Sequence, residues 1–279
     1  MKYITAGNQH NLAAFKFFDV DRVTIGHVRP ALTAEVSNYP EVFVESERRL
    51  TFTDTLIGFE RRSRAMASVL TNLVKNGLSP PEQRELYPVA ATFASEPLFQ
   101  LDRSSISAFG TRAFAIHVNG FIRHPYGAID MWIARRAKGR MAYPGMLDNK
   151  VAGGQPIGLG LVENVIKECA EEAGIPAKLA AQVRPTGTIS YTHEAADGLK
   201  PDIIFFYDLA LPEDFATRNT AREVAVFCRL PLGKVAKIIE SRFEFKFYCN
   251  RVIIDFLIRH GFSPPEHPDY HRLIQGLRQ

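Results

Sequence analysis

Short apolar runs in the first hundred residues predict strands at 22–28 and 41–45, followed by a long amphipathic segment. That segment predicts a helix from about Asp54 to Asn76. Asp54 is placed to act as its N-cap, and Gly77 stands where a helix commonly ends. These features predict a small mixed α/β unit at the N-terminus.

From about Thr111 the apolar runs come closer together. Segments 112–123 and 130–137 alternate well enough to predict a strand pair, joined by a turn near 124–127. Further strands are predicted at 187–194, 202–211 and 223–230, and helices at about 160–174, 231–241 and 247–260. This uneven order favours an α+β fold with a mixed sheet over a regular βαβ repeat. We expect an N-terminal domain at 1–108 and a larger domain at 109–279.

Composition narrows the class of protein. The 279 residues, 46% of them hydrophobic, supply enough material for a core. No apolar run reaches the length of a membrane span and the N-terminal residues lack a secretory layout, so a cytoplasmic address is expected. The net charge of +4 suits a small anionic substrate and is too weak to predict nucleic-acid binding. The oligomeric state, a homodimer included, is left open.

Three cysteines, Cys169, Cys228 and Cys249, are widely spaced and odd in number. They predict reduced, packed thiols and favour neither a disulfide framework nor a zinc site. Eight histidines are scattered without metal-ligand spacing, so we expect ordinary hydrogen bonds from residues such as His117.

Three glutamates carry the clearest chemical signal. Glu168, Glu171 and Glu172 stand at i, i+3 and i+4, so a helix would place the three carboxylates within one turn. Their mutual repulsion requires compensation, and hard divalent cations such as Mg²⁺ or Mn²⁺ prefer oxygen ligands. The alternative is a solvated helix face, since glutamate is a good helix former. The predicted apolar stripe of the same helix comprises Val162, Val165 or Ile166, Cys169 and Ala173.

The surrounding segment resembles the Nudix box, G-x5-E-x7-R-E-U-x-E-E-x-G-U, in which U is a bulky aliphatic residue. Gly153 matches the first glycine, and Glu168, Glu171 and Glu172 match the three helix glutamates. Gly174 and Ile175 match the end of the box, and Cys169 occupies its first U position. The resemblance implies an α/β/α sandwich and a metal-dependent pyrophosphohydrolase, with the carbonyl of Gly153 as a further metal ligand.

Two positions depart from the box. Leu159 replaces the loop glutamate, and Lys167 replaces the arginine. Lysine keeps the charge without the planar fork of arginine, and we expect Glu163, four residues earlier, to hold it in part. The three helix ligands are retained, so we expect a changed rate or metal number. A Nudix-shaped binding protein with weakened catalysis is the alternative.

Other segments extend the resemblance to a subfamily. The runs RELYPV and VIIDFLIRHG, with the stretch from 113 to 154, are similar to Nudix proteins associated with thiamine pyrophosphokinase, which carry an N-terminal extension. The resemblance implies hydrolysis of thiamine diphosphate or its oxidised analogues to the monophosphate. ADP-ribose or dinucleotide pyrophosphatase activity is the rival. Glu223 matches a glutamate that serves the family as a fourth metal ligand or as a general base.

A ring-bearing diphosphate needs basic groups for its phosphates and an apolar surface for its ring. The predicted basic residues precede the box and are Arg136, Lys138, Arg140 and Lys150. Trp132 is the predicted stacking residue, with Phe205 and Tyr207 as further aromatic candidates. Each of these side chains has a simpler reading as surface charge or as core.

Overall fold

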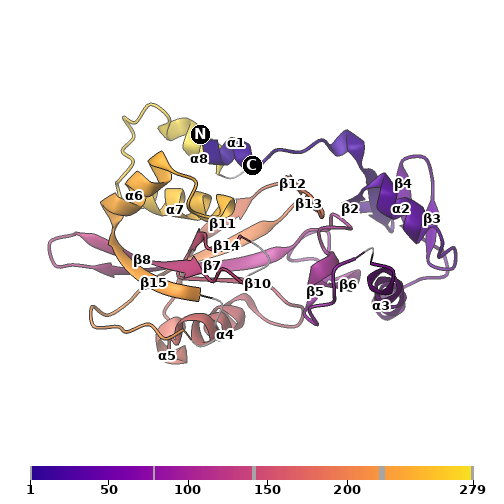
Figure 1. The fold of residues 1–279 in the computed structure, drawn as a ribbon, viewed down its shortest axis with the longest axis horizontal. Helices are drawn as coiled ribbons and strands as arrows, with labels where there is room; N and C mark the ends of the chain where they lie inside the picture. The colour runs from indigo at the N-terminus through magenta and orange to yellow at the C-terminus, as the bar shows by residue number, and fades with distance from the viewer. Residues whose placement is uncertain (1, 78, 140–142, 220–223, 278–279) are drawn as a thin grey trace.

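The computed structural model describes residues 2–77, 79–139, 143–219 and 224–277. Two units with separate sheets lie at opposite ends of an elongated molecule (Figure 1). The smaller, N-terminal unit is drawn in indigo and purple, and the larger unit runs from magenta to yellow.

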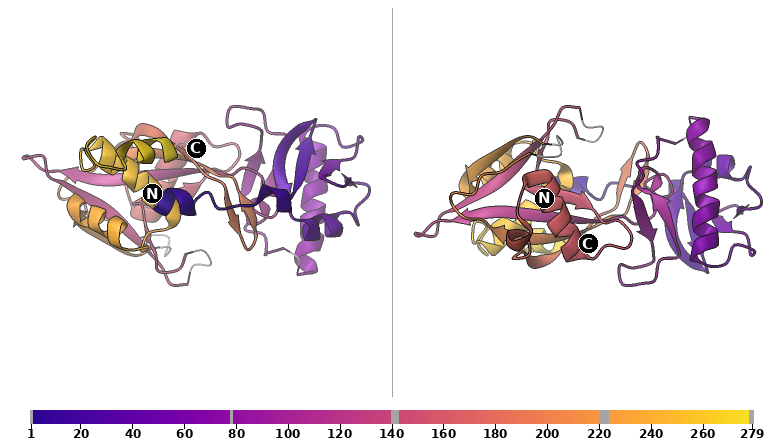
Figure 2. Two further views of the ribbon diagram at one scale, coloured as in Figure 1. Left: turned by 90° about the horizontal axis from the view of Figure 1, so that it is seen from above. Right: turned by 90° about the horizontal axis from the view of Figure 1, so that it is seen from below.

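The N-terminal unit is built on a four-stranded sheet of order β2-β1-β4-β3. Its strands are β1 (Lys16–Val20), β2 (Val23–Val28), β3 (Phe43–Glu45) and β4 (Arg49–Phe52). Its remaining elements are η1 (Leu12–Ala14), α2 (Pro30–Val36), α3 (Phe59–Lys75), the antiparallel pair β5 (Leu86–Val89) and β6 (Phe99–Asp102), and η2 (Arg103–Ser105). Figure 2 shows α3 running across this end of the molecule.

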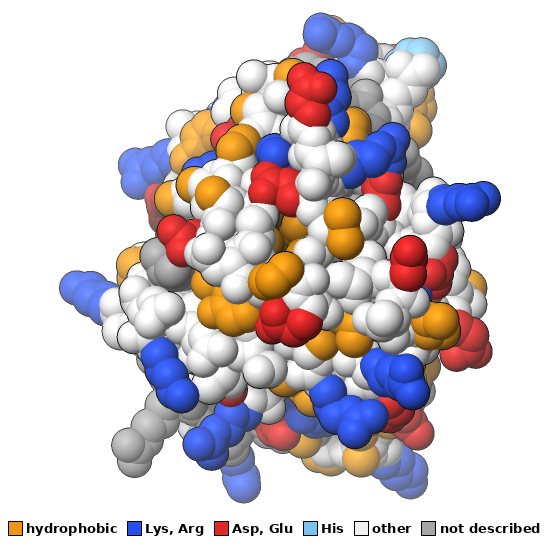
Figure 3. Space-filling view, turned by 90° about the vertical axis from the view of Figure 1, so that its right-hand side faces the viewer, with side chains coloured by type: hydrophobic (Ala, Val, Ile, Leu, Met, Phe, Trp, Pro, Cys, Tyr) orange, Lys and Arg blue, Asp and Glu red, His pale blue; other side chains and the backbone are white. Residues whose placement is uncertain are grey.

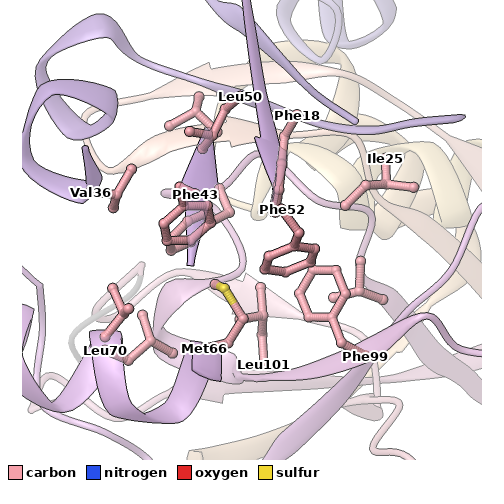
Figure 4. Packing of buried hydrophobic residues seen from close by; sticks show 14 of the residues in the cluster. Phe18, Ile25, Val36, Phe43, Leu50, Phe52, Met66, Leu70, Phe99 and Leu101 are labelled. Carbon is pink, nitrogen blue, oxygen red and sulfur yellow. The ribbon is translucent and has the colours of Figure 1, made fainter. Parts of the chain in front are cut away.

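Aromatic side chains fill the core of this unit (Figure 4). Phe18 is fully buried and makes ring contacts with Phe43, Phe52 and Phe99 at centroid separations of 5.4–6.2 Å. Met66 of α3 packs into the same cluster. The predicted strands at 22–28 and 41–45 and the amphipathic helix are therefore present. The N-cap is Gly58, not Asp54 as predicted, because α3 starts only at Phe59.

A seven-stranded mixed sheet forms the larger unit. Its main path is β11-β14-β7-β8-β15, with β10 paired to β7 and β9 to β8. The strands are β7 (Phe114–Arg123), β8 (Ile129–Arg136), β9 (Leu147–Asp148), β10 (Val151–Gly154), β11 (Arg184–Ser190), β14 (Ile203–Ala210) and β15 (Val224–Pro231). β14 and β7 are parallel and the other pairs of the sheet are antiparallel. A separate hairpin, β12 (His193–Ala195) and β13 (Gly198–Lys200), reaches toward β2.

Helices cover both faces of this sheet (Figure 1). One face carries α4 (Leu161–Ala173) and α5 (Ala177–Ala180), and the other carries α6 (Leu232–Ser241) and α7 (Phe247–Arg259). The predicted α+β sandwich with a mixed sheet, preceded by a smaller α/β unit, is confirmed. In the described part of the chain, no helix combines the length and apolar character needed to span a membrane.

The N-terminal helix α1 (Lys2–Ala6) packs against the larger unit. The Tyr3 hydroxyl donates to the carbonyl of Ile239, and Arg251 of α7 donates to the carbonyl of Ile4 at 2.7 Å. Ile4 also contacts α8 (Tyr270–Gly276) at Gly276. The predicted domain boundary between residues 108 and 109 stays a proposal. Helix α1 precedes this boundary in the sequence but packs against the larger unit.

The outer end of the N-terminal unit carries charges of both signs, interspersed with small apolar areas (Figure 3). Two ion pairs of this unit are partly or largely buried: Arg62–Asp21 at 2.7 Å and Lys16–Glu45 at 2.5 Å. Interspersed charges of both signs are typical of a solvated face, so we assign this surface no separate role.

Candidate active site

Helix α4 is held at both ends by its own sequence. Gly160 is the N-cap, and its backbone N–H donates to the Glu163 carboxylate at 2.9 Å. Gly174 ends the helix with a φ of 62°, the left-handed conformation that glycine adopts without strain. Glu163 therefore caps the helix and does not hold Lys167 as predicted. Val162, expected in the apolar stripe, is 48% exposed, because the buried stripe runs through Val165, Cys169 and Ala173.

Glu168 lies against strand β10. A Cβ built on Gly153 would lie 2.4 Å from the Glu168 Cδ, so only glycine lets the backbone approach this carboxyl group. Burial raises the pKa of Glu168, although Lys167 opposes the shift. The Lys167 Nζ lies 2.8 Å from Glu168 and 3.0 Å from Glu171. Lys167 thus forms ion pairs with two of the three predicted metal ligands.

Glu172 is the most strongly perturbed of the three. Its Oε2 accepts a hydrogen bond from the Ala152 backbone N–H at 3.0 Å, which ties α4 to β10. Burial raises the pKa of Glu172 to about 8. Glu171, in contrast, is exposed beyond half of its side chain. The helix therefore presents two acids toward Gly153 and one toward solvent.

These residues fit a hard divalent cation. Two buried carboxyl groups with raised pKa values meet beside a glycine backbone, and a cation there would offset the burial and repulsion that disfavour their charged forms. Carboxylate and carbonyl oxygens are the ligands that Mg²⁺ and Mn²⁺ prefer. The site residues Gly153, Glu168, Glu171 and Glu172 remain a proposal.

Lys150 and Trp132 contact each other inside the molecule. The Lys150 side chain is fully buried, and its Nζ lies 3.7 Å from the Phe227 ring centroid and 4.8 Å from that of Trp132. Within the described residues this Nζ has no hydrogen-bond partner, and burial lowers the pKa of Lys150 to about 7. Lys150 was predicted to bind phosphate, and the structure places its side chain among the rings beneath α4, so this role stays a prediction.

Arg136 forms an ion pair within a buried polar network on the face of the sheet that α7 covers. Asp148 accepts from Arg136 at 3.0 Å, from the Lys246 Nζ at 2.5 Å and from the Cys249 thiol at 2.9 Å. Burial acts to raise the pKa of Asp148, but Lys246 and His117 outweigh it and hold that pKa below its usual range. Arg136 is thus a partner of Asp148, and its predicted role as a phosphate ligand stays a prediction.

The same network contains three groups that could ligate a metal. His117, Asp148 and Cys249 bring one ligand atom each within 4.8 Å of one another. Two cations already contact Asp148, so an added dication would be repelled, and burial lowers the pKa of His117 to about 4. We interpret this group as a packed hydrogen-bond network. Its members come from three distant segments, so no local spacing could have revealed it.

The N-terminal unit reaches the proposed metal site through β5. The Tyr87 side chain lies on Gly154, and the Ile157 N–H donates to the Leu86 carbonyl at 2.9 Å. Glu85, which pairs with Arg103 at 2.8 Å, is close enough to Glu168 to contribute to its raised pKa. The motif RELYPV therefore lies beside the acids of α4, a contact that sequence reasoning missed.

The other predicted residues divide into three groups. Glu223 and Arg140 lie outside the described residues. Lys138 is exposed. Phe205 packs with Phe93 at 4.7 Å and Tyr207 is buried in the core, so neither aromatic ring forms a free stacking surface.

Comparison with known proteins bears on the whole chain. Residues 1–113 match the family model described as a domain of unknown function, DUF4743. Two Arabidopsis thaliana proteins, Nudix hydrolase 24 and Nudix hydrolase 20, are 37% and 36% identical and match over 96% of this chain and 73% and 74% of their own lengths. The crystal structure of DR0079 from Deinococcus radiodurans is similar with a TM-score of 0.46 and 18% identity, covering 61% of this chain and 98% of that protein.

The two Arabidopsis relatives are both named chloroplastic. The cytoplasmic address expected from the sequence is therefore wrong, because that expectation rested only on the missing secretory layout. An apolar secretory pattern is one of several targeting signals, so its absence does not identify a compartment.

Proposed function

The chain belongs to the Nudix hydrolase family, and from this premise we propose that it cleaves the diphosphate bond of a small organic diphosphate. The proposed substrate is thiamine diphosphate or one of its oxidised analogues, and the products are the monophosphate and phosphate. The proposed cofactor is Mg²⁺ or Mn²⁺. The subfamily resemblance of the N-terminal extension supports the substrate, and the helix acids support the cofactor.

One observation carries the proposal. Glu168 and Glu172 are held against the Gly153 segment of β10 by a glycine-only approach and by the Ala152 hydrogen bond. Neither carboxyl group is placed as a solvated surface acid, which argues against the simplest alternative for the glutamate helix. Buried acids with raised pKa values are enriched at functional sites, which supports the proposal.

The chain's own residues would position the reactants. Glu168, Glu172 and the Gly153 carbonyl would hold the cation, with Glu171 completing the set from the solvent side. A bound divalent cation would neutralise charge on the diphosphate oxygens. Lys167 donates to Glu168 and Glu171 and orients both acids. Water would attack one phosphorus, and the bridging P–O bond would break to release the two phosphate products.

A turnover screen of the purified full chain tests this proposal. Thiamine diphosphate, its oxidised analogues, ADP-ribose, dinucleotides and nucleoside triphosphates are compared with Mg²⁺, with Mn²⁺ and with chelator. We expect metal-dependent turnover that is highest for the thiamine compounds. Glu172→Gln should reduce it by at least about 100-fold, and Glu240→Gln, an exposed helix position, should leave it unchanged.

The outcomes separate the parts of the proposal. Preference for ADP-ribose or a dinucleotide would overturn the substrate and leave the metal site standing. Full activity in a folded Glu172→Gln protein would overturn the metal site. Saturable binding of a thiamine compound without turnover, in the presence of either metal, would identify a binding protein, in agreement with the replacement of the loop glutamate by Leu159.

A further inference from the structure

A cavity of about 470 Å³ opens where β11 and β14 meet the segment that follows α1. Its walls include Asn8, Arg112, Tyr191, Thr192 and Asp202. Two distant segments of this wall are hydrogen-bonded to each other, because the Thr192 N–H donates to the Asn8 side chain at 3.2 Å. Residues from both ends of the sequence therefore shape this space.

Asp202 is the acid of the cavity. Its carboxylate accepts from the Tyr191 hydroxyl at 2.8 Å, and the Tyr191 N–H donates to the Asp202 carbonyl at 3.2 Å. The residue is half-buried, and burial raises its pKa to about 6. The Ala113 backbone N–H also donates to this carboxylate, whose two oxygens can accept more hydrogen bonds than these two. Arg112, which donates to the Ala91 carbonyl at 2.7 Å, adds further donors to the same wall.

Aromatic rings pack behind Tyr191 of this wall. Tyr191 and Tyr248 are stacked with an interplanar angle of 4° and centroids 5.8 Å apart. Phe247 and Tyr143 lie against Tyr248 at 5.0 and 5.9 Å. Tyr143 holds a φ of 51°, a conformation that costs energy for a non-glycine residue and is enriched at ligand sites. These packed rings leave Tyr191 only 5% exposed, and they hold the part of the wall from which its hydroxyl reaches Asp202.

The cavity lies at the same end of the sheet as the proposed metal site. Ala115 of β7 pairs with Gly154 on one side and with Ile204 on the other. Neighbouring strands are about 4.8 Å apart, which places Gly154 and Ile204 about 10 Å from each other. Ile204 packs with Val252 of α7, whereas Gly153 faces Glu168 of α4, so the cavity and the acids approach this end of the sheet from opposite faces. Tyr87, which covers Gly154, feels the charge of both Asp202 and Glu168.

We propose that this cavity binds the organic part of the diphosphate, and that it selects a flat heteroaromatic ring with an N–H donor beside an acceptor atom. Asp202 accepts from the donor, Arg112 donates to the acceptor, and Pro201 and Ile203 supply the adjoining apolar lining. The proposal rests on the proposed function for the identity of the site. It adds the chemical class of the ring and names Asp202 as the residue that determines specificity.

Ring binding without phosphate tests the cavity separately from catalysis. Thiamine and adenosine, which both have such an edge, are titrated in chelator against the full-length protein and followed by ligand-observed NMR. We expect saturable binding of at least one probe and a loss of at least about 10-fold in Asp202→Ala, because hydrogen bonds to a charged acceptor are strong. Tyr191→Phe keeps the ring and removes only the hydroxyl that donates to Asp202, so it should lose less binding than Asp202→Ala. Glu240→Gln, an exposed change on α6, is the control.

Every outcome is decisive for the inference. Absence of binding by both probes to the folded wild-type protein would overturn it, as would unchanged binding in Asp202→Ala. An equal loss in Tyr191→Phe would show that Asp202 acts only by holding Tyr191. Thermal unfolding of each variant verifies that it is folded. The probes carry no phosphate and no metal is present, so the binding result does not depend on the outcome of the hydrolysis screen.

Discussion

The Tyr87 hydroxyl lies on Gly154 so closely that a Cβ on this glycine would be 1.4 Å from it. Tyr87 belongs to the N-terminal unit and Gly154 to strand β10, next to the glycine that faces Glu168. Gly154 therefore permits the contact between the two units. Its neighbour Gly153 permits the contact between the sheet and Glu168 of α4.

Gly154→Ala should destabilise the protein by about 1–3 kcal/mol, because the added methyl group must displace the buried Tyr87 ring. Chemical denaturation measures this change. Gly139→Ala is the control, since nothing lies within 4 Å of a Cβ at that position. The smaller Tyr87→Leu side chain should recover part of the loss in the double variant. Equal stability of Gly154→Ala and Gly139→Ala would contradict the contact.

Lys167 should control the response to the cation. Lys167→Met removes the partner of Glu168 and Glu171, and we expect about 10–100-fold weaker activation by Mg²⁺, as when outer-shell partners of metal ligands are lost. Lys167→Arg restores the box residue and should stay within a few-fold of wild type. Turnover measured against Mg²⁺ concentration gives both values. Lys178→Met, an exposed change nearby, is the control; an unchanged Mg²⁺ curve in Lys167→Met would refute this role.

Local sequence signals predicted the parts of the site that are contiguous in the chain. The spacing of Glu168 and Glu172, and the glycine at 153, identify a helix and loop whose geometry is mostly their own. The same reasoning could not place Lys150, because nearness to the box in sequence does not determine the direction of a side chain. The contact of Tyr87 with Gly154 could not be predicted, since it joins segments that are distant in the chain.

The secondary structure divides in the same way into elements that local sequence predicts and elements that it does not. The helices at 161–173 and 247–259 were predicted because their apolar periodicity is long and strong. Strands β1 and β4 were not, because five- and four-residue runs resemble loop sequence until a neighbouring strand pairs with them. The group of His117, Asp148 and Cys249 is likewise created by packing alone.

Asp148→Asn should cost about 3–5 kcal/mol of stability, because it leaves the Lys246 and Arg136 charges buried without their carboxylate. Asp197→Asn is the matched control. Asp197 pairs with Lys200 at 3.0 Å in a partly exposed position, where such pairs contribute at most about 1 kcal/mol. Urea unfolding at pH 7 compares the two variants. Similar losses in both would mean that the buried network is not a structural element.

Lys150→Met should stabilise the protein at neutral pH and change its dependence on pH. The pKa of Lys150 is lowered from 10.5 to about 7 by burial, so between these values the unfolded chain binds a proton that the folded chain lacks. The lysine therefore opposes folding most strongly below about pH 7, and wild-type stability should rise between pH 7 and 10 by up to about 1.4 kcal/mol per unit. Denaturation in chelator across this range should show that slope in wild type and in Lys138→Met, an exposed control, and a smaller slope in Lys150→Met. Equal slopes in all three proteins would show that Lys150 keeps its charge in the folded state, in which case the rings of Phe227 and Trp132 stabilise a buried ammonium group.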